Sequence, residues 1–249
     1  MNKRKIVIIG ATSAIAEHCA RRWAAEMPDE MILVGRDRFR TERVASDLRV
    51  RTPTTQITSI EADFLDSEKI QGLADAINRT GPIEIALIAQ GSLPNQQQCQ
   101  NRLSGCREAL EINGISPVLF AEALVGHMEK ANRGTLAIIG SVAGDRGRKS
   151  NYIYGSAKGL VTRYVQGLQH RLAKTGVKVV LIKPGPTDTP MMAHSKRQGM
   201  KLASVEGVAE RIVLGIARGA PVIYAPAPWA AIMMIVRHIP SRIFNRLNV

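Results

Sequence analysis

Short apolar runs alternate with longer helical patterns along almost the whole chain, and this alternation constrains the fold more than any other feature. Seven runs have the length and composition of buried strands: 5–9, 31–34, 55–60, 83–88, 135–140, 177–183 and 221–225. Six stretches repeat apolar residues at helical spacing: 14–26, 38–50, 67–79, 107–130, 152–174 and 205–218. Such alternation predicts βαβ units, and therefore an α/β fold with a parallel sheet of about seven strands flanked by helices.

We find no sequence signal of a second domain, a leader segment or a metal site. The 249 residues suffice for one core, and no repeat or Gly/Ser/Pro-rich linker divides them, so we expect a single domain over 1–249. Basic residues 3–5 precede an apolar run too short for a signal peptide. The cysteines (Cys19, Cys99, Cys106) lack metal-binding or C-x-x-C spacing, and the five histidines are scattered. These features predict reduced thiols, no metal and a cytoplasmic protein.

The segment after the first predicted strand has the form of a phosphate-binding turn. Its candidate binding residues are Gly10, Thr12, Ser13, Ala14 and Ile15. A strand, a small-residue turn and a helix N-terminus direct free N–H groups and the helix dipole at an anion. The usual dinucleotide pattern has three glycines; here only Gly10 is present, with Ala14 and Ala16 at the other places. Alanine still permits close approach, but a positive φ at Ala14 would be strained.

A second group of polar residues has the composition of an acid/base site. Tyr154 and Lys158 lie four residues apart, on one face of the predicted helix, and Ser141 precedes the tyrosine by thirteen positions. A free tyrosine has a pKa of about 10, so it exchanges protons poorly at neutral pH unless a cation stabilises the phenolate. Lys158 could supply that cation, and Ser141 could hold a substrate oxygen, which suits interconversion of a carbonyl and an alcohol. Alone, a Y-x-x-x-K pattern is more often an ordinary helix surface.

The phosphate-binding turn near the N-terminus, followed later by Ser141, Tyr154 and Lys158, resembles the short-chain dehydrogenase/reductase superfamily. The resemblance covers essentially the whole chain. Residues 10–16, GATSAIA, are similar to its G-x-x-x-G-x-G turn with two alanines in place of glycine. Its four catalytic positions match Asn113, Ser141, Tyr154 and Lys158. Further matches are Asp63 and Phe64 near the adenine, Ala89, Gln90 and Gly91 for its Asn-Ala-Gly segment, and Pro184, Gly185, Thr187 and Thr189 in its P-G-x-x-x-T loop.

The resemblance implies a Rossmann-type, doubly wound fold that binds a nicotinamide dinucleotide and reduces a ketone. The cofactor supplies hydride, and the protein supplies position and electrostatics. Tyr154 would protonate the developing alkoxide while Ser141 holds that oxygen. Lys158 would lower the tyrosine pKa and bond the ribose, and Asn113 would hold a water that relays protons to Lys158. The resemblance also implies that the P-G-x-x-x-T loop covers the nicotinamide, and that the chain forms a homodimer or homotetramer.

Given that resemblance, the residues after the second strand favour NADP(H) over NAD(H). An acidic side chain at the end of this strand would bond the ribose 2′-hydroxyl and repel a 2′-phosphate. Here Gly35 occupies that place and Arg36 follows, and a guanidinium can grip a phosphate with two hydrogen bonds. The alternative is that Arg36 points to water at a helix N-terminus that Asp37 caps.

The tail of the chain, from about 226 to 249, is apolar and basic. No acidic residue follows Glu210, whereas arginines recur as far as Arg246. Prolines interrupt the apolar stretch, which is too short to span a membrane. An apolar, basic helix that carries Trp229 is instead typical of an interfacial anchor, and the net charge of +13 favours an anionic surface. The alternative is a tail that buries its apolar side between subunits.

The tail and the segment after Ser141 also resemble the decaprenylphosphoryl-2-keto-erythro-pentose reductases, a branch of the same superfamily. The similar segments are 224–227, 233–240 and 143–146. This resemblance implies a keto-sugar on a polyprenyl phosphate, a precursor of cell-envelope polysaccharide, reduced at the inner face of the membrane. Arg146, Arg148 and Lys149 would then meet the lipid phosphate, or else lie on a solvated loop.

Two other functions are compatible with the sequence. A 3-oxoacyl-[acyl-carrier-protein] reductase, or another carbonyl reductase, would use the same four residues, and a basic surface would suit an acidic carrier protein. It would not need the apolar tail. A non-catalytic NADP(H)-binding regulator would typically lack one of the four, and all are present. Nucleic acid is not an expected partner, because aromatic residues make up only 4% of the chain and are not interleaved with basic ones.

Overall fold

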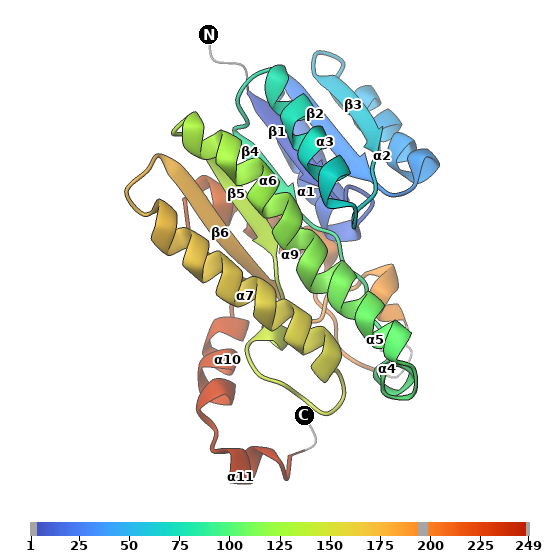
Figure 1. Ribbon diagram of the computed structural model, residues 1–249, viewed down its shortest axis with the longest axis vertical. Coiled ribbons are helices and arrows are strands. Elements are labelled where there is room, and N and C mark those ends of the chain that lie inside the picture. Colours follow the sequence, from blue (N-terminus) through green and yellow to red (C-terminus); the bar gives the residue numbers. More distant parts are fainter. Residues whose placement is uncertain (1–3, 194–198, 248–249) are drawn as a thin grey trace.

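The computed structural model describes residues 4–193 and 199–247, which form a seven-stranded parallel sheet between layers of helices (Figure 1). The strands are β1 (Lys5–Ile9), β2 (Glu30–Gly35), β3 (Gln56–Glu61), β4 (Ile85–Ile88), β5 (Gly134–Ile139), β6 (Val177–Pro184) and β7 (Val222–Ala225). Their order is β3-β2-β1-β4-β5-β6-β7, and every neighbouring pair is parallel. The predicted doubly wound fold is confirmed. Its strand order reverses between β1 and β4, where such sheets bind ligands.

The central strands are almost continuously apolar because helices cover both faces of the sheet. Every residue of β1 and β2 is buried, as expected for parallel strands without a solvated face. Successive side chains of β1 enter opposite cores, because a strand alternates its side chains with a period of two. Ile6 and Ile8 join one core, whereas Val7 and Ile9 join the other.

Each core is closed by its own set of helices. The first set is α1 (Ala14–Ala24), α2 (Arg38–Arg51) and α9 (Val205–Ala217); the second is α3 (Ser67–Arg79), α6 (Ser116–Lys130) and α7 (Tyr152–Leu172). The shorter helices are α4 (Gln96–Asn101) and α5 (Leu103–Leu110) ahead of α6, and α10 (Trp229–His238) and α11 (Ser241–Phe244) in the tail. In Figure 1 the tail helices extend beyond the carboxyl end of the sheet, beside the loop between β5 and α7.

The predicted helix 107–130 differs most from the structure. It consists of α5, a π-helical turn at Glu111–Ile115, and α6. Within the described residues, the stretch Leu103–Lys130 alone has the length and hydropathy to cross a membrane, and 56% of its most apolar window is buried inside the protein. Its apolar character therefore reflects packing in the core.

Candidate active site

The site residues predicted from different segments meet at the carboxyl end of the sheet. Gly10 follows β1, Gly91 follows β4, Ser141 follows β5, and Gly185 follows β6. Because all strands are parallel, their carboxyl ends lie on one edge, and residues far apart in sequence converge there.

Tyr154, Ser141 and Lys158 are brought together as predicted. The Ser141 side chain lies close enough to the Tyr154 hydroxyl to stabilise a negative charge on the phenol. Lys158 Nζ lies 5.9 Å from the centroid of the Tyr154 ring and donates a hydrogen bond of 3.0 Å to the Ile139 carbonyl. Ser141 itself begins a 3-10 turn, Val142–Gly144, and its Oγ accepts from the Ala143 N–H at 3.1 Å.

Two glycines allow α7 to pack directly on the turn that carries Ser141. A methyl group at Gly144 would lie 2.6 Å from the Lys158 carbonyl carbon, and one at Gly155 would lie 2.9 Å from the Ala143 carbonyl oxygen. Side chains at either position would push the serine away from the tyrosine. The close approach therefore depends on the absence of a Cβ.

Burial shifts the pKa values of the tyrosine and the lysine in opposite directions. Burial raises the pKa of Tyr154 above its usual value, although the Ser141 side chain opposes the shift. Burial also lowers the pKa of Lys158 to about 8. The predicted lowering of the tyrosine pKa is therefore wrong for the chain alone. Lys158 directs its ammonium group at the Ile139 carbonyl and not at the phenol oxygen. The loss of hydration therefore affects the tyrosine pKa more than the charge of Lys158 does.

The fourth predicted residue, Asn113, lies buried in the π-helical turn. Its Oδ1 accepts from the Ser92 N–H at 2.8 Å, and its Nδ2 donates to the Ala109 carbonyl at 2.9 Å. A methyl group at Gly91 would lie 3.1 Å from Asn113 Oδ1 and 3.6 Å from Lys158 Nζ. Asn113 and Lys158 thus flank the same point beside Gly91. Sequence reasoning missed the π-helical turn, a feature that is frequent at functional sites.

The turn after β1 has the geometry of an anion cradle. Gly10 has φ +79°, and a methyl group there would lie 2.6 Å from the Gln90 backbone nitrogen. Ser13 is the N-cap of α1, but its side chain makes no capping hydrogen bond, so it leaves the N–H groups of the first turn available to a ligand. Ala14 is already helical. The strain considered for a positive φ at Ala14 is therefore absent.

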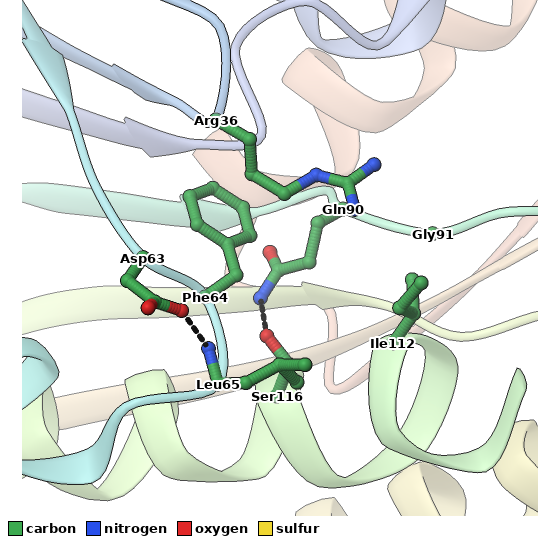
Figure 2. A pocket seen from close by; sticks show the side chains of 8 residues that line it. All are labelled: Arg36, Asp63, Phe64, Leu65, Gln90, Gly91, Ile112 and Ser116. Atoms are coloured by element: carbon green, nitrogen blue, oxygen red, sulfur yellow. Dashed lines mark hydrogen bonds between the residues drawn. The ribbon is translucent and has the colours of Figure 1, made fainter. Parts of the chain in front are cut away.

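A pocket lies beside this cradle, between the ends of β2 and β4. Its lining residues are Arg36, Asp63, Phe64, Leu65, Gln90, Gly91, Ile112 and Ser116 (Figure 2). Gln90 Nε2 donates to Ser116 Oγ at 3.2 Å, whereas its buried Oε1 has no hydrogen-bond partner within the described chain. A buried acceptor without a partner costs stability unless a ligand donor satisfies it. The pocket and the cradle together fit a dinucleotide.

Arg36 is exposed at the edge of this pocket, and its side chain extends over it toward Gln90 in Figure 2. Asp37 caps α2 as considered from the sequence, because its Oδ1 accepts from the Arg40 N–H at 2.9 Å. Gly35 is required by packing, since a methyl group there would overlap the Thr41 hydroxyl. The carboxylate at position 63 accepts from the Leu65 N–H at 3.0 Å.

The P-G-x-x-x-T loop packs against the tail. The Gly185 N–H donates to the Ala225 carbonyl at 2.9 Å, and Thr187 Oγ1 donates to the Gly185 carbonyl at 2.9 Å. A methyl group at Gly185 would overlap the Trp229 indole. The Trp229 ring therefore lies against the loop expected at the nicotinamide, and the interfacial role expected for its helix stays a prediction.

Arg146 also has a role that the sequence did not reveal. Its Nη1 donates to the carbonyl oxygens of Val236, Arg237 and Ile239 at 3.0, 3.0 and 2.6 Å, and its guanidinium lies 4.0 Å from the centroid of the Phe244 ring. These carbonyls belong to the C-terminal end of α10, which lacks intrahelical partners for them. Arg146 is thus occupied by the tail, which corrects its proposed contact with a lipid phosphate.

No metal site is found within residues 4–193 and 199–247, since no three His, Cys, Asp or Glu side chains there are grouped to hold an ion. The three cysteines are free.

A sheet of this order, with Ser, Tyr and Lys converging beside a dinucleotide-shaped cradle, defines a nicotinamide-dependent oxidoreductase of the α/β class. The family model for short-chain dehydrogenases matches residues 4–199. The chain therefore belongs to the short-chain dehydrogenase/reductase family of oxidoreductases.

Relatives extend this similarity over the whole chain. An uncharacterized oxidoreductase of Streptomyces coelicolor is 28% identical over 247 residues, which cover 99% of this chain and 96% of that protein. Another uncharacterized oxidoreductase, from Mycobacterium tuberculosis, is 28% identical and covers 97% of this chain and 96% of its own.

Solved structures share the fold at lower identity. A short-chain dehydrogenase from Sphingobium yanoikuyae, in complex with NADPH, has a TM-score of 0.82 at 22% identity and covers 99% of this chain and 96% of its own. The bulky-bulky ketone specific alcohol dehydrogenase from Comamonas testosteroni has a TM-score of 0.81 at 23% identity. The match covers 100% of this chain and 96% of that protein.

Proposed function

We propose that residues 1–249 form one NADPH-dependent reductase domain that converts the keto group of a sugar, carried on a polyprenyl phosphate, into an alcohol. The observation that carries the catalytic assignment is the convergence of Tyr154 and Ser141 beside the buried Lys158. Asn113, which lies with Lys158 beside Gly91, completes the set.

The chain's own residues would position the substrate and move one proton. Bound NADPH would supply hydride to the keto carbon. The hydroxyls of Ser141 and Tyr154 converge, so a keto oxygen placed between them receives two hydrogen bonds. A phenol whose pKa stays at or above its usual value is still a far stronger acid than an alcohol, and Tyr154 would therefore give its proton to the developing alkoxide. Asn113 and Lys158 flank one point, which one bridging water would fill as a proton path.

The residues around the pocket would hold NADPH in a defined orientation. The cradle of Gly10, Thr12, Ser13, Ala14 and Ile15 would receive the pyrophosphate. Asp63 and Phe64 would lie at the adenine, and Ala89, Gln90 and Gly91 along the ribose. Pro184, Gly185, Thr187 and Thr189 would border the nicotinamide. Arg36 would contact the 2′-phosphate. Fold neighbours bound to NADPH and NADP support this preference.

Three features support a lipid-linked, anionic substrate. Arg148 lies beside the tail, with Nη2 3.9 Å from Met233 Sδ, and burial lowers its pKa, so an anion there would relieve the cost of its desolvation. Met234 and Ile235 expose apolar side chains on α10. The third feature is the resemblance to the keto-pentose reductases, from which we infer that the keto group belongs to a sugar. We expect a cytoplasmic homodimer or homotetramer that works at the inner face of the membrane.

Tyr154→Phe tests the catalytic assignment, with Tyr152→Phe as the matched control. Tyr152 lies two residues earlier on α7 and is 39% exposed, so it does not share the face of Tyr154. We expect Tyr154→Phe to lower turnover by about 10²–10⁴-fold, the usual share of general acid catalysis, with NADPH affinity nearly intact. Tyr152→Phe should keep both.

The assay should use polyprenyl-phosphate keto-sugars, 3-oxoacyl thioesters and simple ketones side by side. Turnover of Tyr154→Phe within tenfold of the parent would contradict the acid/base role. Preference for 3-oxoacyl thioesters over keto-sugars would instead reject the lipid-linked sugar and leave the chemistry of the four residues standing.

A further inference from the structure

The loop that carries Ser141 is joined to the end of β6 by a buried ion pair. Asp145 lies four residues after the serine, and its carboxylate pairs with the ammonium of Lys183. The two side chains are only 2% and 4% exposed. Lys183 immediately precedes Pro184 and Gly185, which start the loop expected at the nicotinamide. The pair therefore connects the two segments that flank the proposed reaction centre.

Tyr224 occupies the second oxygen of the same carboxylate. Its hydroxyl donates to Asp145 Oδ2 at 2.9 Å, and in the sheet Tyr224 of β7 is the register partner of Lys183 of β6. Lys183 Nζ also lies 5.5 Å from the centroid of the Tyr224 ring. Burial and the charge of Asp145 raise the pKa of Tyr224 to about 12, so it remains a donor. Three elements thus meet at one carboxylate.

Backbone hydrogen bonds within one turn connect Asp145 to Ser141. The Asp145 N–H donates to the Val142 carbonyl at 3.2 Å, and the Gly144 N–H donates to the Ser141 carbonyl at 3.1 Å. The Ser141 side chain closes the same turn. Displacement of Asp145 would therefore reshape the turn that presents the Ser141 hydroxyl.

Stability alone does not account for such a group. Buried ion pairs lose hydration, and apolar side chains of similar volume often replace them without loss of stability. A second buried pair, Lys5 with Glu30 at 3.6 Å, lies at the opposite end of the sheet, away from the site. That pair offers an internal comparison, because its burial is similar and its distance from the reaction centre is large.

We propose that Asp145, held by Lys183 and Tyr224, is a positioning residue that fixes the Ser141 hydroxyl relative to the loop beginning at Pro184. This inference rests on the proposed function, in which Ser141 holds the keto oxygen and the loop borders the nicotinamide. It assigns these three residues a role in aligning the oxygen with the incoming hydride. Misplacement of a reacting group by about 1 Å costs on the order of 10²-fold in rate.

The test removes both charges together, so that no lone buried charge remains. Lys183→Met with Asp145→Asn should lower kcat by about 10–100-fold, with the NADPH dissociation constant and the substrate KM within threefold of the parent. The matched double variant, Lys5→Met with Glu30→Gln, should keep the parent kcat. Tyr224→Phe removes a single hydrogen bond and should lower kcat several-fold without a change in melting temperature beyond a few degrees.

The outcomes separate this inference from the proposed function. If Tyr154→Phe loses turnover but the Lys183/Asp145 double variant and Tyr224→Phe keep theirs, the positioning role is overturned and the catalytic assignment stands. If Tyr154→Phe keeps its turnover, the proposed function itself fails. Should the double variant not fold, Tyr224→Phe decides: an unchanged kcat overturns the inference.

Discussion

The proposed preference for NADPH depends on a single guanidinium, that of Arg36 at the edge of the pocket (Figure 2). Arg36→Ala should weaken NADPH binding about 10–100-fold, because hydrogen bonds to charged groups contribute about 1.5–3 kcal/mol, and should leave NADH within twofold. Fluorescence titration with both cofactors measures this. Arg38→Ala, at the next exposed arginine on the start of α2, is the control. Equal losses for the two cofactors would show that Arg36 is a surface residue.

The buried Lys158 makes a separate prediction about stability and pH. Its pKa falls from 10.5 to about 8 on folding, a difference equivalent to roughly 3 kcal/mol. Below pH 8 the lysine is charged in both states, and the folded chain bears the full penalty. Between pH 8 and 10.5 the unfolded chain binds more protons, so the stability of the folded chain rises with pH.

Lys158→Met should therefore raise the melting temperature by about 6–12 °C at pH 7, since a penalty of roughly 3 kcal/mol corresponds to about 2–4 °C per kcal/mol for a chain of this size. The gain should shrink above pH 8 and vanish near pH 10.5. Melting curves across this range, with Lys178→Met on the exposed part of β6 as control, measure it. A gain that is independent of pH would contradict the assignment of the penalty to the charge.

At the scale of elements, periodicity predicted what depends on burial and missed what depends on backbone detail. The seven strands and six main helices follow from apolar runs and helical spacing, because each must bury a face against the sheet. The π-helical turn at Glu111–Ile115 has no such signal, because a single turn is too short to show a change of period in the apolar pattern. The sequence indicates an apolar, basic helix in the tail but not the contacts of α10 with the loop after Ser141, because these span some ninety residues of sequence.

The sequence likewise predicts some residues of the candidate site and not others. Asn113, Ser141, Tyr154 and Lys158 were predictable because their spacing matches a family pattern. Asp145, Lys183 and Trp229 were not assigned to the site, because their partners come from distant segments that no local pattern connects. One signal was present: glycines at 144, 155 and 185 mark three places where another segment approaches the backbone closely.

At the scale of the whole molecule, charge and apolar surface coincide on the tail. The net charge is +13, and α10 and α11 expose apolar side chains next to Arg237, Arg242 and Arg246. The inward face of the same helices is occupied, because Met233 and Phe244 are buried and Arg146 binds the carbonyls of α10. The tail thus presents one packed face to the site and one free apolar, basic face. Deleting the tail would remove both faces at once, so substitutions on the exposed face are the sharper test of membrane binding.

We expect the free face of α10 and α11 to bind anionic membranes reversibly. Each arginine near such a surface contributes about 1 kcal/mol, and the exposed apolar side chains add insertion at the interface. Sedimentation with anionic vesicles should fall as salt rises and should be absent with neutral vesicles. Met234→Ser with Ile235→Ser, at side chains that are 56% and 64% exposed, should weaken binding several-fold, whereas Val50→Ser, at an 83% exposed position on α2, should not. Chromatography of the same variants tests the competing explanation: if the double substitution dissociates an oligomer and leaves vesicle binding unchanged, the face is a subunit contact, and the membrane assignment is rejected.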